Sequence, residues 1–184
     1  VDYEVLEQFH EGIIALSACL AGIVATNLRQ GFYDEAKKEA LRLRDIFGEN
    51  NFFLELQDHG ISDQTTVNQG LLRMSQETGI ELVATNDVHY IMADDAKAHD
   101  ILLCIQTNKT VNDVDRMEFK TSEFYLKTEE EMRSLFPNLP QAYDNTQKIA
   151  DRCNVEFEFG VRKLPRFDVP NNEDHYDYFR RKCY

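Results

Sequence analysis

Three short apolar runs, separated by two amphipathic helical patterns, constrain the fold of this chain more than any other feature. The runs are residues 12–18, 52–57 and 82–85. The helical patterns are residues 32–47 and 65–78, and each is closed by a glycine. Strand, helix, strand, helix, strand at such spacings is typical of a parallel sheet, and right-handed crossovers bring all three strand ends to one face. The sequence therefore predicts an α/β fold.

The first and third runs are each followed by residues of the types that bind metal ions in proteins. Asp87 and His89 come after the third run, and Cys19 comes after the first. Ligands gather beyond the carboxyl ends of strands in such sheets, so these side chains are expected to point into one pocket. A thiolate, a carboxylate and an imidazole form part of a zinc, manganese or iron site. The alternative is that Asp87 caps a turn and His89 is an ordinary, partly buried histidine.

The second run delivers more polar residues to the same edge of the predicted sheet. Glu55, Asp58 and His59 lie at its end. They are expected at the rim of the pocket, outside the metal's own ligands. A simple turn with a partly exposed histidine explains Asp58 and His59 equally well.

A further helix is predicted directly after the third run and its polar turn. It covers residues 94–106. Helical spacing places Ala98, Ile101, Leu102 and Ile105 on one side of it, and this side is expected to be the buried one.

The last third of the sequence predicts two more helices and then a change of pattern. Thr128 and Glu131 have the spacing of a capping box, which opens the first of these helices. The second covers residues 139–153. Residues 155–160 alternate like a half-buried strand, and prolines beyond them indicate a linker. A domain edge is therefore expected near Gly160.

Composition excludes several classes of protein. No apolar run is long enough to span a bilayer and no signal-peptide pattern is present, so the expected compartment is the cytoplasm. The four cysteines are scattered without a C-x-x-C pair, which favours free thiols. Twenty basic residues against 33 acidic ones give a formal net charge of −13. The chain by itself should therefore be repelled by nucleic acid.

Six stretches of the chain, in order, resemble the bacterial replicative DNA polymerase III alpha subunit. They are EGIIALSACLAG at 11–22, FFLELQDHG at 52–60, LVATNDVHY at 82–90, DDAKAHDILLCIQTNK at 94–109, FKTSEFYLKTEEEM at 119–132 and NTQKIADRCNV at 145–155. The resemblance is to the second half of that family's PHP domain, named for polymerase and histidinol phosphatase, and to the run into the polymerase core. The last two stretches do not resemble small PHP phosphatases, which disfavours a free-standing phosphatase.

The resemblance implies a partial PHP-type barrel. The complete domain is a distorted, TIM-like barrel of seven strands, and this chain is expected to lack its N-terminal strands and to carry a helical C-terminal extension. Residues 1–160 would then be the C-terminal part of the PHP domain, and residues 161–184 the linker and the start of the polymerase core. The late metal ligands of the family fall on Cys19, Asp87 and His89. Its early H-x-H motif has no counterpart in this sequence.

The resemblance also implies a function for the parent protein. That function is template-directed DNA synthesis, with DNA, deoxynucleoside triphosphates and other replisome subunits as partners and Mg²⁺ for the polymerase chemistry outside this chain. The PHP metal site would serve 3′–5′ exonuclease proofreading. The alternative is a non-catalytic scaffold that stabilises the polymerase or docks a proofreading subunit. The chain alone is expected to be inactive, to bind metal and DNA weakly, and to self-associate through an exposed strand edge.

Overall fold

The computed structural model describes residues 1–165 and 167–184, and these divide into two compact units. The first unit is Val1–Cys153 and the second is Asn154–Tyr184. The assignment of residues 1–160 to a PHP domain and of 161–184 to a polymerase core stays a prediction. Among the described residues, no helix is both long and apolar enough to cross a membrane.

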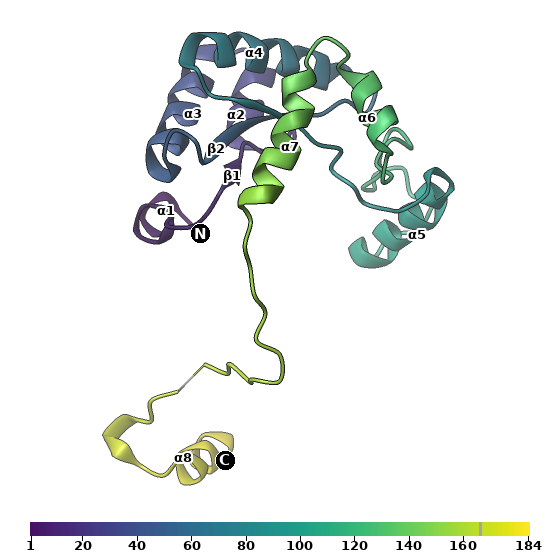
Figure 1. The fold of residues 1–184 in the computed structure, drawn as a ribbon. Coiled ribbons are helices and arrows are strands. Elements are labelled where there is room, and N and C mark those ends of the chain that lie inside the picture. Colours follow the sequence, from purple (N-terminus) through teal and green to yellow (C-terminus); the bar gives the residue numbers. More distant parts are fainter. Residues whose placement is uncertain (166) are drawn as a thin grey trace. The chain divides into compact units, whose positions relative to one another are not determined.

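The first unit is built around a parallel sheet of three strands (Figure 1). The strands are β1 (Ala15–Leu16), β2 (Phe52–Leu56) and β3 (Leu82–Ala84), in the order β1-β2-β3. Ala15 pairs with Phe52, and Leu54 pairs with Leu82. The predicted parallel sheet is therefore confirmed.

The first strand is shorter than the predicted run of residues 12–18. Gly12 has φ 74° within a turn, and Ala18 has φ 67°. Both values lie in the left-handed region, where an extended strand cannot continue. The apolar pattern continues past the strand, but the backbone turns at both ends.

The helices have bounds close to those predicted wherever the sequence showed helical spacing. They are α1 (Tyr3–Phe9), α2 (Ile23–Arg29), α3 (Tyr33–Phe47), α4 (Ser62–Thr78), η1 (Ala93–Asp95), α5 (Ala96–Thr107), α6 (Glu129–Leu135), α7 (Pro140–Arg152), η2 (Pro170–Asn172) and α8 (His175–Cys183). The capping box is confirmed, because the Thr128 hydroxyl accepts from Glu131 N and a Glu131 carboxylate oxygen accepts from Thr128 N.

The core lies between the sheet and helices α2, α3, α4 and α7. Four residues of β2 are at most 1% exposed, which is typical of a strand covered on both faces: Phe52, Phe53, Leu54 and Leu56. Helix α2 packs closely on α4, since a Cβ at Gly70 would lie 2.7 Å from Leu28 Cδ2. This side of the sheet has little room for added volume.

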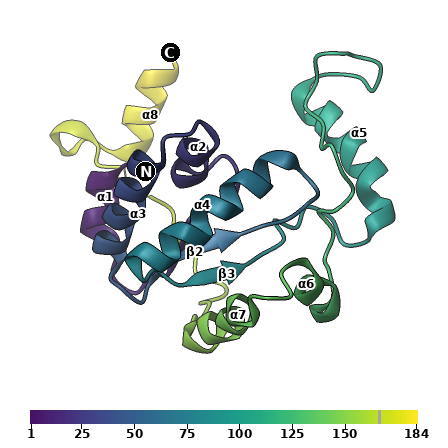
Figure 2. The ribbon, with the colours of Figure 1, turned by 90° about the horizontal axis from the view of Figure 1, so that it is seen from above.

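Helix α7 packs against β3, the strand at one edge of the sheet (Figure 2). The buried side chain of Asn145 donates from Nδ2 to the main-chain oxygen of Leu82 at 2.8 Å. Edge strands carry main-chain groups without a strand partner. Asn145 satisfies one such group, so α7 covers this edge with a hydrogen bond as well as with apolar contact.

The predicted buried stripe of α5 is wrong. Ile101, Leu102 and Ile105 are 52%, 61% and 71% exposed, and Ala98 is exposed as well. The buried side of the helix is the neighbouring one, carrying Leu103 and Cys104. Helix α5 stands away from the sheet (Figures 1 and 2) and packs on the loop that follows it, so its apolar residues do not reach the main core.

The strand predicted for residues 155–160 is also absent from the described structure. Val155, Phe157 and Phe159 are 72%, 76% and 90% exposed, and no strand pairs with them. Alternation indicates which side chains would share a face, but a strand forms only where a neighbour supplies its hydrogen bonds.

We expect Asn145→Ala to lower the free energy of unfolding by about 1–3 kcal/mol, because it leaves the Leu82 carbonyl buried without a donor. Urea unfolding followed by circular dichroism measures this. Gln147→Ala, on the exposed side of the same helix, is the matched control and should change stability by less than about 0.5 kcal/mol. Equal losses in the two variants would contradict the assigned role of Asn145.

Candidate functional site

The carboxyl ends of the three strands are joined by one carboxylate, that of Glu55. Its Oε2 accepts from the main-chain N–H of Ala18 at 2.9 Å, beyond the end of β1. Its Oε1 accepts from Thr85 Oγ1 at 2.5 Å, beyond the end of β3, and from Gln57 Nε2 at 3.1 Å. The Glu55 main-chain N–H donates to Ser17 Oγ at 2.8 Å. Glu55 therefore fixes the spacing of the loops that carry the predicted site.

The loop after β1 is tightly turned, and this turn places Cys19. Ala18 has φ 67°, an unfavourable value for alanine, and its N–H is held by Glu55. A Cβ at Gly22 would lie 2.4 Å from the main-chain oxygen of Ser17. Only glycine fits there, so Cys19 occupies a turn that tolerates little substitution.

The loop after β3 is anchored to a segment far along the chain. Asn86 donates from Nδ2 to the main-chain oxygens of Glu123, at 3.0 Å, and Tyr125, at 2.7 Å. A parallel bridge between Tyr90 and Tyr125 continues this contact. Asp87, with φ 42°, lies within the anchored stretch. Aspartate tolerates this left-handed conformation better than most residues do.

Cys19 and Asp87 line one cavity of about 350 Å³, as expected for residues beyond the ends of parallel strands. Its other walls come from α2, from the start of α4 and from the segment around Phe119 and Phe124. Gln57 and Gln64 add amide groups, and Arg29 and Lys120 add positive charge. The cavity therefore combines acidic, basic and neutral polar groups.

His89 lies beside this cavity and does not line it. Its Nδ1 is 2.6 Å from the main-chain oxygen of Asp87. A carbonyl oxygen only accepts, so Nδ1 carries the proton, and Nε2 has no hydrogen-bond partner among the described residues. The ring lies edge-on to Phe119, with centroids 4.6 Å apart, and to His99, with centroids 5.5 Å apart. His89 thus belongs to an aromatic cluster at the edge of the site.

The trio of Cys19, Asp87 and His89 does not form a metal site by itself. In the described part of the chain, no three or more His, Cys, Asp or Glu residues converge closely enough to hold a metal ion. The two side chains that share a cavity offer one sulfur and one carboxylate, which is fewer than the three protein ligands of a catalytic zinc site. The residues present here therefore do not fit a complete centre.

None of the three residues expected at the pocket rim lines the cavity of about 350 Å³, but Glu55 shares a smaller one, of about 10 Å³, with Cys19. Glu55 is the strand-joining carboxylate described above. Asp58 accepts from the main-chain N–H of Gly60 at 2.9 Å and so forms a turn. His59 is 0% exposed and its ring stacks on Phe124, with centroids 3.9 Å apart.

Both ring nitrogens of His59 are used in hydrogen bonds. Nε2 donates to the main-chain oxygen of Asn86 at 2.9 Å, and Nδ1 accepts from Gln64 Nε2 at 2.7 Å. Gln64 in turn accepts from the His59 main-chain N–H at 2.7 Å. Burial lowers the pKa of His59, and the hydrogen bond to Asn86 opposes this only in part. The ring is therefore a neutral structural link between the loops after β2 and β3.

Sequence reasoning missed Gln64, Phe119 and Phe124 as parts of the site. Gln64 precedes the residues with clear helical spacing, although α4 already begins at Ser62. The two phenylalanines lie about 100 residues after Cys19 in a segment without periodic pattern. Nothing in the sequence indicated where this segment lies in the fold.

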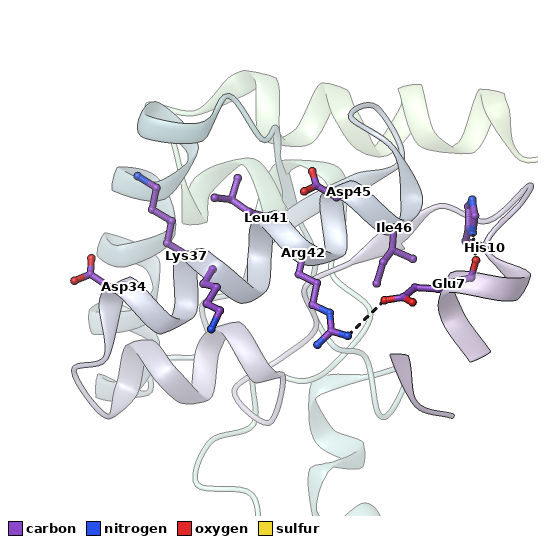
Figure 3. A pocket seen from close by; sticks show the side chains of 9 residues that line it. Glu7, His10, Asp34, Lys37, Leu41, Arg42, Asp45 and Ile46 are labelled. Atoms are coloured by element: carbon purple, nitrogen blue, oxygen red, sulfur yellow. Dashed lines mark hydrogen bonds and ion pairs between the residues drawn. The ribbon is translucent and has the colours of Figure 1, made fainter. Parts of the chain in front are cut away.

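A larger groove of about 830 Å³ lies between α1 and α3, where it is open to solvent (Figure 3). An ion pair of 3.4 Å joins Arg42 of α3 to Glu7 of α1 across it. None of the predicted site residues lines it. Size alone therefore does not identify the site.

Comparisons with known proteins support the resemblance found in the sequence. A family model described as the PHP domain matches residues 1–59. The chain is 45% identical over 179 residues to the DNA polymerase III subunit alpha of Treponema pallidum, covering 96% of this chain and 15% of the relative. Subunits of the same name from Deinococcus radiodurans and Thermus aquaticus are 40% and 39% identical over 100% and 98% of this chain.

The chain spans about 15% of the length of these curated relatives. The similarity extends well beyond residues 1–59, over α5, α6 and α7. The predicted resemblance to bacterial DNA polymerase III alpha subunits is therefore confirmed.

His59 predicts a pH dependence of stability. Its folded-state pKa lies below the ordinary value of about 6.5, so the unfolded chain binds a proton that the folded chain does not. The stability that the neutral ring of His59 contributes is fully present above a pH of about 6.5 and is lost as the pH falls below this value. We expect the free energy of unfolding to fall less steeply with decreasing pH in His59→Phe than in the natural chain. Urea titrations at several pH values measure this.

A second histidine must be separated from this effect, because burial and nearby His89 also lower the pKa of His99. The same titrations on His99→Phe measure how much of the pH dependence of stability comes from His99. An unchanged slope in His59→Phe, with native circular dichroism at neutral pH, would contradict the neutral buried state of His59.

Proposed function

We propose that this chain is a segment of the alpha subunit of a bacterial replicative DNA polymerase, an enzyme of template-directed DNA synthesis. The observation that carries the proposal is the identity of 39–45% with such subunits over 96–100% of the chain. The matched PHP family model and the parallel sheet are consistent with a partial PHP-type barrel. DNA, deoxynucleoside triphosphates and other replisome subunits would be partners of the intact cytoplasmic protein.

The site residues have a defined role in this proposal. Cys19, Asp87 and His89 contribute to a site for a divalent zinc, manganese or iron ion whose other ligands lie elsewhere in the intact protein. Nε2 of His89 has no hydrogen-bond partner among the described residues, which supports this, since metal-binding histidines commonly donate their other ring N–H to a carbonyl. Mg²⁺ for polymerase chemistry would bind outside this chain.

A second candidate is a non-catalytic scaffold that stabilises the polymerase or docks a proofreading subunit. It is favoured by the absence of a three-ligand group among the described residues. In that case the trio is structural, and the loops that Glu55 joins serve only to complete the fold.

One set of measurements on the intact protein separates the two. Metal content by elemental analysis and a 3′–5′ nuclease assay are made with the natural protein and with His89→Ala. Loss of metal and of nuclease activity, with primer extension retained, supports the metal-dependent exonuclease. A protein without metal and nuclease activity, unaffected by His89→Ala, supports the scaffold. Absence of primer extension by the intact protein would contradict the polymerase assignment itself.

We expect weak zinc binding by the chain alone, because two ligands in one cavity and a third beside it do not complete a site. Affinity should rise with pH, since imidazole and thiol ligands bind metals after losing their protons. Titration calorimetry measures both effects. Asp87→Ala should weaken binding further, whereas Asp58→Asn, in a turn outside the cavity, should not. Equal effects of the two substitutions would contradict the proposed ligands.

We also expect the chain to self-associate through β1, which forms the sheet edge opposite to the one that α7 packs against. The net charge of −13 opposes contact between two copies, so association should strengthen as salt screens the charge. Light scattering over a range of protein and salt concentrations tests this. A monomer at every concentration would rule it out.

A further inference from the structure

Two positive side chains line the cavity that Cys19 and Asp87 share, and they come from different walls of it. Arg29 is the last residue of α2, and Lys120 follows Phe119 in the segment after α5. Both reach solvent, with side chains 42% and 73% exposed. No other lysine or arginine of the described chain lines this cavity. An anion in it would therefore meet positive charge on two sides.

The hydrogen-bond donors of Arg29 are available to a ligand. Its Nη1 lies 3.8 Å from Asp63 Oδ2, which is longer than a hydrogen bond. The guanidinium has no hydrogen-bond partner among the described residues, and Asp63 is itself half exposed, so this ion pair is weak. A guanidinium carries five N–H donors in one plane, and this geometry matches two oxygens of a phosphate group.

The position of Arg29 is fixed by the packing of α2. Leu28, the residue before it, is 6% exposed and packs closely on Gly70 of α4. Helix α2 also begins at Ile23, shortly after Cys19. One short helix therefore connects the turn of Cys19 to Arg29 and holds both residues at the same cavity.

Lys120 keeps donors for a second anion, although Glu118 binds it. Lys120 Nζ lies 2.5 Å from Glu118 Oε1, and the same carboxylate lies 3.4 Å from Arg116 Nη2. An ammonium group has three donors, and the contact with Glu118 uses one of them. Because Glu118 shares its charge between two cations, it does not fully cancel the charge of Lys120.

The proposed function supplies one anion in abundance, the phosphate of DNA. At least half of the hydrogen bonds between proteins and DNA go to phosphate and sugar groups, with arginine and lysine as frequent donors. We propose that Arg29 and Lys120 bind one phosphodiester of a single DNA strand and hold it beside Cys19 and Asp87. The inference rests on the proposed function, since that function brings a DNA strand to this cavity.

Negative charge nearby limits the affinity in the chain alone. Asp87 lines the same cavity, and the chain as a whole has a formal net charge of −13. Both repel a phosphate group. Binding of a short DNA strand should therefore be weak and is measured with millimolar ligand.

The test uses the chain itself with the dinucleotide d(TpT) and with its methylphosphonate analogue, which lacks the negative charge of the phosphate. Titrations followed by saturation-transfer NMR give the affinity of each. The dinucleotide should bind at least about threefold more tightly than the analogue, because charged contacts that are partly open to water are individually weak. Equal affinities, or no binding of d(TpT) at millimolar concentration, would overturn the proposal.

Arg29→Gln and Lys120→Gln each remove one positive charge and keep most of the length of the side chain. Each should weaken d(TpT) binding by about twofold to fivefold and leave binding of the neutral analogue unchanged. Lys97→Gln is the matched control, because Lys97 is an exposed residue of α5 that does not line the cavity. It changes the net charge equally and should leave d(TpT) binding unchanged. Equal losses in all three variants would show a general effect of charge and rule out the site.

Asp63→Asn separates phosphate binding by Arg29 from a purely structural role. It removes the carboxylate paired with Arg29 and should therefore tighten d(TpT) binding by about twofold. In the Arg29→Gln background the same substitution should leave the affinity unchanged. An equal gain in both backgrounds, or no gain in the natural one, would show that Arg29 does not contact the phosphate.

Failure of this inference is distinguishable from failure of the proposed function. In the intact protein, Arg29→Gln should raise the KM of the 3′–5′ nuclease for single-stranded DNA and leave metal content and primer extension unchanged. Nuclease activity with an unchanged KM would overturn the phosphate site alone. An intact protein without metal and nuclease activity, whose segment still binds d(TpT) through Arg29, would overturn the metal-dependent nuclease alone.

Discussion

The Glu55 carboxylate is the interaction on which the arrangement of the site depends. Its two oxygens accept from groups that follow β1 and β3, while its own strand lies between them. A single side chain thus sets the distance between the loop of Cys19 and the loop that leads to Asp87. Because Ala18 adopts a left-handed conformation, the hydrogen bond from its N–H also offsets local backbone strain. The turn and the pocket are therefore held by the same group.

Much of the fold could be predicted because local pattern and order along the chain determine it. Local signals predict the helix ends at Gly48 and Gly79 and the capping box at Thr128. The order of strands and helices along the chain predicts the parallel pairing of the three runs. The exposed side of α5 could not be predicted in this way. Helical spacing shows that Ile101, Leu102 and Ile105 share one region of the helix surface, but not whether a core lies against it.

The site was predictable to the same degree. The shared cavity of Cys19 and Asp87 follows from the rule that parallel strand ends meet at one edge. That rule does not predict the burial of His59 or the cavity walls formed by Phe119 and Phe124. Both depend on a segment that returns to the sheet from far along the chain. Asn86 lies in the polar turn predicted after the third run. In the structure its side-chain amide holds the distant segment by two hydrogen bonds, to the main-chain oxygens of Glu123 and Tyr125.

The hydrogen bond from Asn145 to Leu82 joins residues 63 positions apart, and this separation has a consequence for folding during synthesis. A ribosome adds roughly 5–20 residues per second, so the edge of β3 emerges several seconds before the helix that covers it. During that interval the three strands are complete and one edge of the sheet is open to any other unpaired strand. The length of time during which this edge can mispair is therefore set by the number of residues between β3 and α7, and not by the stability of the finished sheet.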